Sequence, residues 1–437
     1  MKTQPNSPAI KWRKLHSGQK SIYDQLSGRD ILRCGRRFGK TELFETRFSK
    51  RATMGRKIGW FAPEYKLIRP TYKRIYGLLY PLIDRASKTE AFIQLKRTDR
   101  NTIPGSVEFW SLDNEDAGRS RDYDDVVIDE ASLKLKGLRE IVEQAIMPTL
   151  LDRRGTLTLG GTPKGIDPEN FFYVACTDKT LGFKEFHAPT RMNPFLDPLG
   201  VAKLSEQYPP LVYQQEFLAE FVDWSGEAFF SLDKLLTDGQ QLAFPETCDT
   251  VFAVIDSATK TRTENDGTGV TYYAYVENAW TGPALYVLDW DIRQIEGSLL
   301  ELWLPEVFAR LEELSALCHA RFGVSGVWIE DKASGMILLQ QATRKNLNVH
   351  AIDGKLTALG KSERAINVSG YVYQNKVKIT QFAHSKVVNY KGITKNHFLS
   401  QVTGFRVGVK EQQDDDLLDT LCYGLALTLG RQEDIMG

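Results

Sequence analysis

The chain has 437 residues, more than one ordinary domain core needs, so two domains are expected. Hydrophobic residues make up 42% and charged residues 26%, as in a globular protein that folds in water. Lys and Arg together number 56, as do Asp and Glu, and this zero net charge excludes a uniformly basic nucleic-acid coat. No apolar run is long enough to span a membrane, and the first residues lack the apolar core of a signal peptide. The five cysteines are scattered without a C-x-x-C pair, which disfavours a disulfide framework or a zinc site and is typical of a cytoplasmic protein.

Strand-like runs alternate with helical patterns over the first half of the chain. This alternation is typical of an α/β domain with a mostly parallel sheet, and we expect that domain to span residues 1–208. Its predicted strands lie at residues 30–33, 57–61, 107–110, 125–128 and 156–159.

A glycine loop follows the first of these strands at residues 34–41, with the sequence C-G-R-R-F-G-K-T. Backbone N–H groups of such a loop, placed before a helix, converge on a phosphate. We expect Lys40 to reach the β- and γ-phosphates of a nucleotide and the Thr41 hydroxyl to bind Mg²⁺. Cys34 stands where the usual pattern has glycine. The nucleotide-binding residues predicted from this loop are Gly35, Arg36, Arg37, Gly39, Lys40 and Thr41.

An apolar strand that ends in Asp129-Glu130 provides the partner motif. Asp129 would bind the Mg²⁺, and Glu130 would polarise the attacking water as the catalytic base. Upstream, Gln19 either reads the adenine edge or is an exposed helix residue. Arg119 is either an arginine finger that reaches a neighbouring subunit or an ordinary surface residue.

A second series of strand-like runs begins at residue 251 and predicts a mixed α/β sheet within residues 248–437. Turn signals dominate residues 209–247, which we expect to form a linker or small subdomain. The predicted strands of this second domain lie at residues 251–255, 270–275, 284–288 and 326–329.

Acidic residues end two of these strands and open the last apolar helix. Asp256, Glu330, Asp415 and Asp416 could together hold a pair of Mg²⁺ or Mn²⁺ ions and hydrolyse a phosphodiester, as in ribonuclease-H-like nucleases. Glu330 and its neighbour Asp331 point to opposite faces of a strand, so only one can face the site, and Glu330 is favoured. Five other residues are open candidates. Asp414 and Asp419 are alternative third ligands, and Asp266 is a loop residue or an accessory ligand. Lys361 and Arg364 either contact the DNA backbone or belong to an ordinary solvated helix start.

In this order, the motifs resemble those of the large terminase subunits of tailed bacteriophages over nearly the whole chain. The resemblance implies an N-terminal P-loop ATPase that moves double-stranded DNA through a portal protein into a procapsid. It further implies a C-terminal ribonuclease-H-like nuclease that cuts concatemeric DNA. The shared motifs are the loop at residues 34–41, D-V-V-I-D-E-A at 125–131, G-G-T-P-K-G at 160–165, V-I-D-S-A at 254–258, W-I-E-D-K-A-S-G at 328–335 and D-D-L-L-D-T-L at 415–421.

The same resemblance implies a ring of subunits on the procapsid, formed from monomers in the host cytoplasm, and a small terminase subunit that selects the DNA. ATP with Mg²⁺ would serve the first domain, and a pair of Mg²⁺ or Mn²⁺ ions the second. Where many relatives have His before two acids, this chain has Asp414, so the register of the third ligand is open by one residue. Two other functions remain: a helicase-like translocase whose second domain binds DNA without cutting it, and a scaffold that only binds nucleotide.

Overall fold

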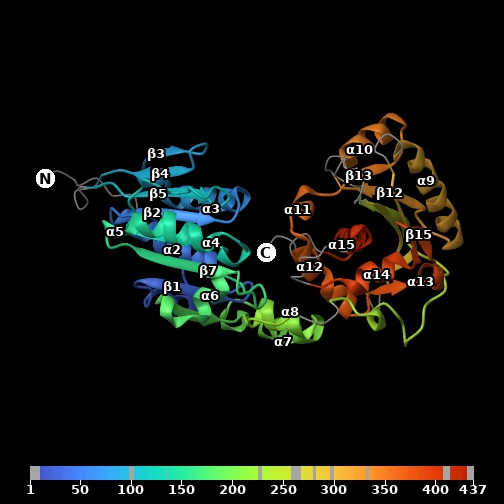
Figure 1. The fold of residues 1–437 in the computed structure, drawn as a ribbon, viewed down its shortest axis with the longest axis horizontal. Coiled ribbons are helices and arrows are strands. Elements are labelled where there is room, and N and C mark those ends of the chain that lie inside the picture. Colours follow the sequence, from blue (N-terminus) through green and yellow to red (C-terminus); the bar gives the residue numbers. More distant parts are fainter. Residues whose placement is uncertain are drawn as a thin grey trace. The chain divides into compact units, whose positions relative to one another are not determined.

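The computed structural model describes residues 10–97, 103–134, 136–224, 229–256, 267–278, 282–295, 300–330, 334–406 and 414–430. The chain divides into two compact units (Figure 1). The first contains residues 1–204 and 210–223, and the second contains residues 205–209 and 224–437. The segment 209–247, expected as a linker of its own, is thus divided between the two units.

The first unit contains an eight-stranded sheet in the order β3-β4-β5-β2-β6-β7-β1-β8. The strands from β5 to β8 in that order are parallel, whereas β3, β4 and β5 pair in antiparallel fashion at one edge. The expected mostly parallel sheet is therefore confirmed. The strands are β1 (Arg29–Cys34), β2 (Lys57–Ala62), β3 (Ile83–Ser87), β4 (Phe92–Leu95), β5 (Ser106–Ser111), β6 (Asp125–Ile128), β7 (Thr156–Gly161) and β8 (Lys184–Ala188).

Helices cover both faces of this sheet, which explains why its central strands are apolar without alternation. All four residues of β6 are buried. Phe44 and Phe48 of α2 pack with Trp60 on one face, and Phe172 of α6 packs with Phe61 on the other. The helices up to residue 212 are α1 (Ser17–Tyr23), α2 (Lys40–Thr53), α3 (Tyr65–Leu79), α4 (Leu138–Glu140), α5 (Met147–Leu151), α6 (Phe171–Thr177), α7 (Pro198–Gln207) and α8 (Pro210–Val212).

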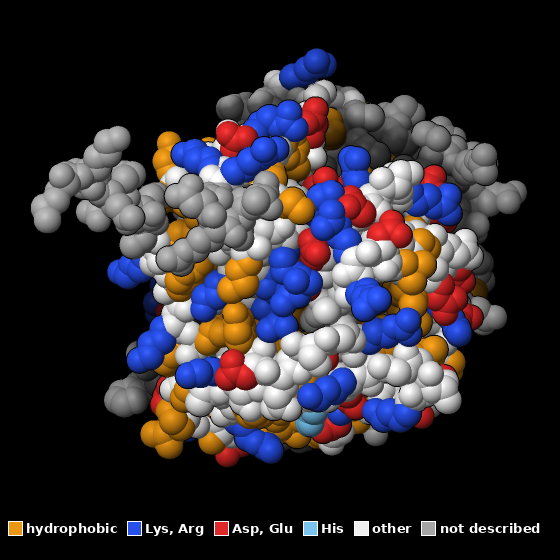
Figure 2. All heavy atoms as spheres, turned by 90° about the vertical axis from the view of Figure 1, so that its left-hand side faces the viewer, with side chains coloured by type: hydrophobic (Ala, Val, Ile, Leu, Met, Phe, Trp, Pro, Cys, Tyr) orange, Lys and Arg blue, Asp and Glu red, His pale blue; other side chains and the backbone are white. Residues whose placement is uncertain are grey.

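The surface of the first unit is of mixed charge. On the face turned to the viewer in Figure 2, Lys and Arg side chains lie among Asp and Glu side chains. Several of the basic residues of this unit are paired with acids, as are Arg51 with Asp125 at 2.6 Å and Lys57 with Asp122 at 2.7 Å. The equal numbers of acidic and basic residues, 56 of each, make such pairing possible.

The second unit contains a six-stranded mixed sheet in the order β13-β12-β9-β10-β11-β14. Strand β10 runs antiparallel to both β9 and β11, while β12 and β13 run parallel to β9. The first five strands of that order form the sheet of a ribonuclease-H-like fold, as expected. The strands are β9 (Thr250–Asp256), β10 (Thr268–Val276), β11 (Ala284–Arg293), β12 (Val324–Ile329), β13 (Val349–Ala351), β14 (Val377–Ile379), and a separate pair, β15 (Val388–Tyr390) and β16 (Ile393–Lys395).

Helical layers lie on the two faces of this sheet. Alternate residues of β10 point to opposite faces, so Tyr272 joins the core beneath α9, whereas the Tyr273 hydroxyl donates to the Thr420 carbonyl of α15 at 3.1 Å. The helices of the second unit are α9 (Leu300–Leu317), α10 (Ser334–Arg344), α11 (Gly354–Thr357), α12 (Lys361–Tyr373), α13 (Gln381–Ser385), α14 (His397–Gly404) and α15 (Asp416–Thr428).

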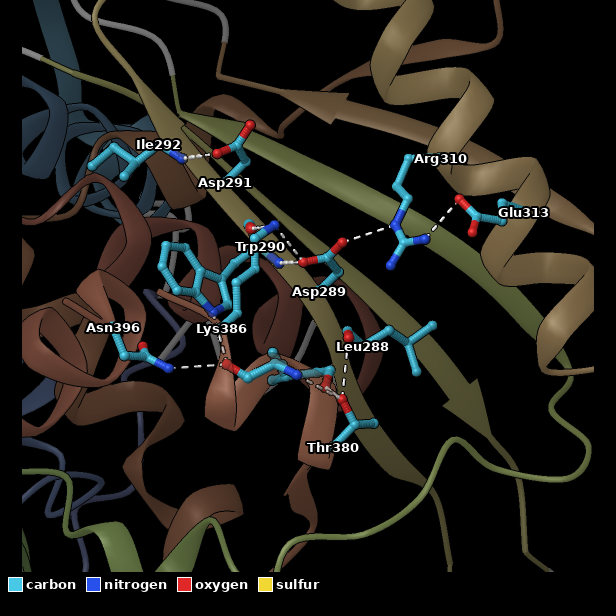
Figure 3. A network of polar contacts seen from close by, with 12 residues as sticks. Leu288, Asp289, Trp290, Asp291, Ile292, Arg310, Glu313, Thr380, Lys386 and Asn396 are labelled. Carbon is cyan, nitrogen blue, oxygen red and sulfur yellow. Dashed lines mark hydrogen bonds and ion pairs between the residues drawn. The ribbon is translucent and has the colours of Figure 1, made fainter. Parts of the chain in front are cut away.

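A buried carboxylate on β11 ties two of these helices to the sheet (Figure 3). Asp289 is only 3% exposed and accepts from Arg310 Nε of α9 at 2.8 Å and from Lys386 Nζ, just after α13, at 2.7 Å. The indole N–H of the neighbouring Trp290 donates to the Ala383 carbonyl at 2.9 Å. Two cations therefore compensate one buried charge at this position.

No helix in the described part of the chain is both long and apolar enough to cross a membrane.

Candidate functional site

The glycine loop of the first unit connects the carboxyl end of β1 to the first turn of α2. Gly39 has φ of 94°, a left-handed conformation that glycine adopts without strain. Gly35 allows a close approach, because a Cβ at this position would lie 2.6 Å from Thr190 Oγ1. That contact explains why the chain needs glycine at position 35, although Cys34 departs from the usual loop pattern.

Lys40, Thr41, Asp129 and Glu130 come together at the carboxyl edge of the parallel sheet. Lys40 Nζ lies 2.8 Å from Asp129 Oδ1 and 2.7 Å from Glu130 Oε1, and Thr41 Oγ1 donates to Asp129 Oδ2 at 2.8 Å. Burial disfavours the charged form of Lys40, but the two carboxylates outweigh it and raise the pKa of Lys40. The hydroxyl and carboxylate predicted to share a Mg²⁺ are therefore neighbours.

Gly160, on β7 between β1 and β6, leaves room for the lysine. A Cβ at this position would lie 2.5 Å from the Phe44 ring and 2.8 Å from Lys40 Cδ, so a larger residue would displace both side chains. Gly160 is the first glycine of the G-G-T-P-K-G motif, and this contact gives a steric reason for a glycine there.

Arg36 is held by a buried acid that the sequence did not single out. Its Nε lies 2.5 Å from Glu216 Oε2, in the π-helical turn Tyr213–Phe217, and Lys164 Nζ lies 3.3 Å from Glu216 Oε1. Burial raises the pKa of Glu216, but Lys164 and Arg36 outweigh it and lower that pKa to about 2. The loop, the segment after β7 and residues 213–217 are thus joined through one carboxylate.

Gln19 and Arg119 make contacts within the chain. The Gln19 side chain is 2% exposed; its Nε2 donates to the Gly39 carbonyl at 2.7 Å, and its Oε1 accepts from the His16 N–H. Gln19 therefore braces the loop and is not an exposed helix residue. Arg119 lies on the surface with 53% of its side chain exposed and pairs with Asp116 at 2.8 Å.

The acids of the second unit lie at adjacent strand ends. Ile329 of β12 pairs with Ile255 of β9, so the next residues, Glu330 and Asp256, are neighbours, and their side chains are hydrogen-bonded. Burial, followed by the charges of Asp419, Asp416 and Glu330, raises the pKa of Asp256 far above its usual range. The Tyr423 hydroxyl donates to Glu330 Oε1 at 2.9 Å.

Three of the four acids near the start of α15 have cationic partners. Asp414 pairs with Lys391 at 2.6 Å, Asp415 pairs with Lys361, and Asp419 pairs with Arg364 at 2.6 Å. Asp416 instead lies over β10, where a Cβ at Gly269 would be 3.1 Å from Asp416 Cβ, and Gly269 pairs with Asp256 in the sheet. Burial and then the charge of Asp414 raise the pKa of Asp416 to about 7.

The structure therefore brings Asp256, Glu330, Asp416 and Asp419 into one electrostatic group and directs Asp415 toward Lys361. Arg364, considered as a DNA contact or a solvated residue, is neither in this structure, because its side chain is 10% exposed and paired with Asp419. Asp266 and Asp331 lie outside the described residues. The role of Tyr423 carries no signal in the sequence.

Divalent metal ions fit this donor set chemically, because carboxylate oxygens are the ligands that Mg²⁺ prefers and these repel one another. Asp419 Oδ1 is buried and has no hydrogen-bond partner among the described residues. In the same part of the chain, no group of three or more His, Cys, Asp or Glu side chains is yet arranged around one metal position.

Large terminases of phages resemble this chain in sequence and in fold. No protein-family model matches the chain. It is 29% identical over 270 residues to the terminase large subunit of Thermus phage G20c and 28% identical over 270 residues to that of Thermus virus P23-45. Each match includes 51% of this chain and 52% of the relative, so the chain matches about half the length of these relatives.

The solved large terminase of a thermophilic bacteriophage superposes on nearly the whole chain. The superposition has a TM-score of 0.63 at 14% identity and covers 95% of this chain and 100% of that one. The chain has the fold of a phage large terminase. Both units of the terminase fold are present in it, in the same order along the chain. That bacteriophage terminase has also been solved in complex with ADP and with ATP-γ-S.

Proposed function

We propose that this chain is the large terminase subunit of a tailed phage, which hydrolyses ATP to move double-stranded DNA into a procapsid and cuts concatemeric DNA. The observation that carries the proposal is the presence of two complementary sites in one chain. One joins Lys40, Thr41 and Asp129 at a glycine loop, and the other gathers Asp256, Glu330 and Asp416 on a ribonuclease-H-like sheet. The portal protein, the small terminase subunit and a ring of subunits in the host cytoplasm are the corresponding partners and setting.

At the first site, the N–H groups of the loop and the ammonium of Lys40 would bind the phosphates of ATP. Thr41 and Asp129 would hold Mg²⁺, which neutralises charge on the phosphates when bound. Phosphate binding would draw Lys40 away from Glu130, and the freed carboxylate would orient a water molecule for attack. Arg119, on the surface, would serve a neighbouring subunit as an arginine finger, and Gln19 would hold the loop through Gly39 rather than read adenine directly.

At the second site, Asp256, Glu330 and Asp416 would hold Mg²⁺ or Mn²⁺. A bound pair of these ions supplies an activated water and stabilises the leaving oxygen of the phosphodiester. Asp416 is preferred to Asp415 as the third ligand, because Asp415 is paired with Lys361. Asp419 lies one turn further along α15 and would contribute its unpartnered oxygen to the metal or to a water bound to it.

Two assays on the purified chain test the two halves separately. Supercoiled plasmid is incubated with Mn²⁺ and either the natural chain or Asp256→Ala, and we expect cutting that the variant loses. ATP hydrolysis is measured in parallel for Glu130→Gln, which should retain nucleotide binding and lose turnover. Equal cutting by Asp256→Ala would reject the site, and no metal-dependent cutting even with the assembled motor would favour the translocase that binds DNA without cutting it.

A further inference from the structure

A series of polar contacts connects α12 to α15 and to Glu330 in the second unit. Arg364 NH2 lies 2.6 Å from Asp419 Oδ2, and the Arg364 guanidinium carbon lies 5.0 Å from the centre of the Tyr423 ring. The Tyr423 hydroxyl in turn donates to Glu330 Oε1 at 2.9 Å. These contacts therefore connect the metal-ligand candidate Glu330, directly after β12, with Asp419 on α15.

Arg364 contacts α15 at two points on one face of the helix. Asp419 and Tyr423 are four residues apart, so they lie on the same face of the helix, and one guanidinium contacts both. Asp416 lies three residues before Asp419, in the first turn of that helix. Arg364 is itself anchored, since its NH1 donates to the Leu359 carbonyl at 2.8 Å. The guanidinium fork therefore helps to hold the face of α15 from which Asp416 projects.

Tyr423 orients the second acid. One oxygen of Glu330 accepts from the tyrosine hydroxyl, and the carboxylate also hydrogen-bonds to Asp256. A carboxylate anchored in this way loses less rotational freedom when it binds an ion. Groups that orient metal ligands typically change metal affinity by about 10- to 100-fold when they are removed.

We infer that Arg364 and Tyr423 are positioning residues of the nuclease site, which orient Asp416 and Glu330 for divalent cations without contacting metal or DNA themselves. The inference rests on the nuclease function proposed above. It assigns the buried Arg364 to the metal centre, and it leaves Lys361 and Lys391, at 33% and 25% side-chain exposure, at the rim.

The experiment is a calorimetric titration of Mn²⁺ into the full chain, combined with the Mn²⁺ dependence of plasmid cutting. Tyr423→Phe removes one hydroxyl and should weaken Mn²⁺ binding by about 10-fold, while cutting at saturating Mn²⁺ changes much less. Arg364→Ala should weaken binding by roughly 10- to 100-fold, and Arg364→Lys should restore part of the loss because it keeps the charge facing Asp419.

Tyr273→Phe is the matched control, because it also removes a buried hydroxyl that donates to α15, at the Thr420 carbonyl, but touches no acid. It should lower the unfolding temperature about as much as Tyr423→Phe and leave Mn²⁺ affinity unchanged. Equal Mn²⁺ affinities for Tyr423→Phe and Tyr273→Phe would overturn the inference. Asp256→Ala separates the two proposals: if it abolishes Mn²⁺ binding while Tyr423→Phe has no effect, only the positioning role fails. If Asp256→Ala has no effect on binding or cutting, the nuclease site itself fails.

Discussion

The two sites hold their carboxylates in opposite electrostatic settings. In the first unit, Asp129 is paired with Lys40 at 2.8 Å, and the pair raises the pKa of the lysine. In the second unit, Asp256 and Asp416 lie near other acids. Burial raises the pKa of both aspartates, and the charges of the neighbouring acids raise it further. In the first site a lysine contacts both acids, whereas in the second the acids raise the pKa of Asp256 despite the ion pair of Arg364 with Asp419.

This difference identifies the ligand that each site would accept. At the first site, ATP with Mg²⁺ can replace the ion pairs of Lys40 with Asp129 and Glu130. The phosphates would take the lysine, and the Mg²⁺ would take the aspartate. A group of carboxylates that outnumbers the cations beside it is stabilised by binding further cations. Within the second unit the same criterion separates Asp416 from Asp414, Asp415 and Asp419, each of which has a basic partner.

The largest expected effect is that of Lys40→Ala on ATP hydrolysis. The substitution removes the positive charge at the loop and leaves Asp129 and Glu130 to repel the phosphates of ATP. We expect kcat/KM for ATP to fall by roughly 10³-fold in a steady-state phosphate-release assay. Lys50→Ala, on the same helix α2 but stacked on the Trp12 ring, is the control and should stay near the natural rate. Similar losses in both variants would show that a change in α2, rather than the lost charge, explains the result.

Asp289→Ala tests the opposite situation within the second unit, a buried carboxylate that is fully compensated. Removing it leaves the charges of Arg310 and Lys386 facing one another near Trp290, so the free energy of unfolding should fall by about 3–5 kcal/mol. Urea denaturation followed by tryptophan fluorescence measures the change. Asp291→Ala, which removes a partner of the half-exposed Arg293, should cost about 1 kcal/mol or less. Equal losses of unfolding free energy in the two variants would contradict the role of Asp289 as a buried anchor (Figure 3).

Much of the fold could be predicted because the central strands are buried on both faces and therefore read as short apolar runs. The edge strands could not be predicted in this way. β3 has the sequence I-D-R-A-S, in which Asp84 and Arg85 are exposed, so it shows neither an apolar run nor alternation. β8, K-E-F-H-A, has the same weakness, and pairing with β1 rather than its own composition makes it a strand.

For the sites, the sequence indicated the residue types and their places at strand ends, but not which acid of a run faces inward. Asp415 and Asp416 are adjacent, and their difference depends on Lys361, which is distant along the chain. The pairing of Arg364 with Asp419 likewise joins residues 55 positions apart. Such contacts follow from helix packing, and local patterns in one sequence do not encode them.

Glu216 is a compensated acid of the first unit, and its pKa is lowered to about 2. Because its pKa in the folded state lies below that of an unfolded Glu, its charge stabilises the first unit above about pH 4.5. This contribution is lost as the pH falls through about 2, and it amounts to roughly 3 kcal/mol. Glu216→Gln should therefore be less stable than the natural chain at pH 6, and the difference should shrink toward pH 2. A difference that does not change with pH in urea denaturation would show that the charge of Glu216 is not what joins Arg36 to Lys164.

Asp416→Asn should show the opposite dependence on pH, which is the sharpest form of the comparison between the two units. The pKa of Asp416 is raised to about 7, so the protonated acid favours folding, and this stabilisation is complete below about pH 4 and lost as the pH rises through 7. Without metal, the asparagine variant should gain stability relative to the natural chain over that range, by about 2 kcal/mol, since partial exposure reduces the full effect of the shift. Glu306→Gln, which removes an exposed partner of Arg293 in the same unit, is the control and should show no such gain. Saturating Mn²⁺ should abolish or reverse the gain, because the ion stabilises the charged aspartate of the natural chain and not the amide. If the gain persists with Mn²⁺, Asp416 is repelled by its neighbours but does not bind the metal, and the third ligand must be sought in Asp419.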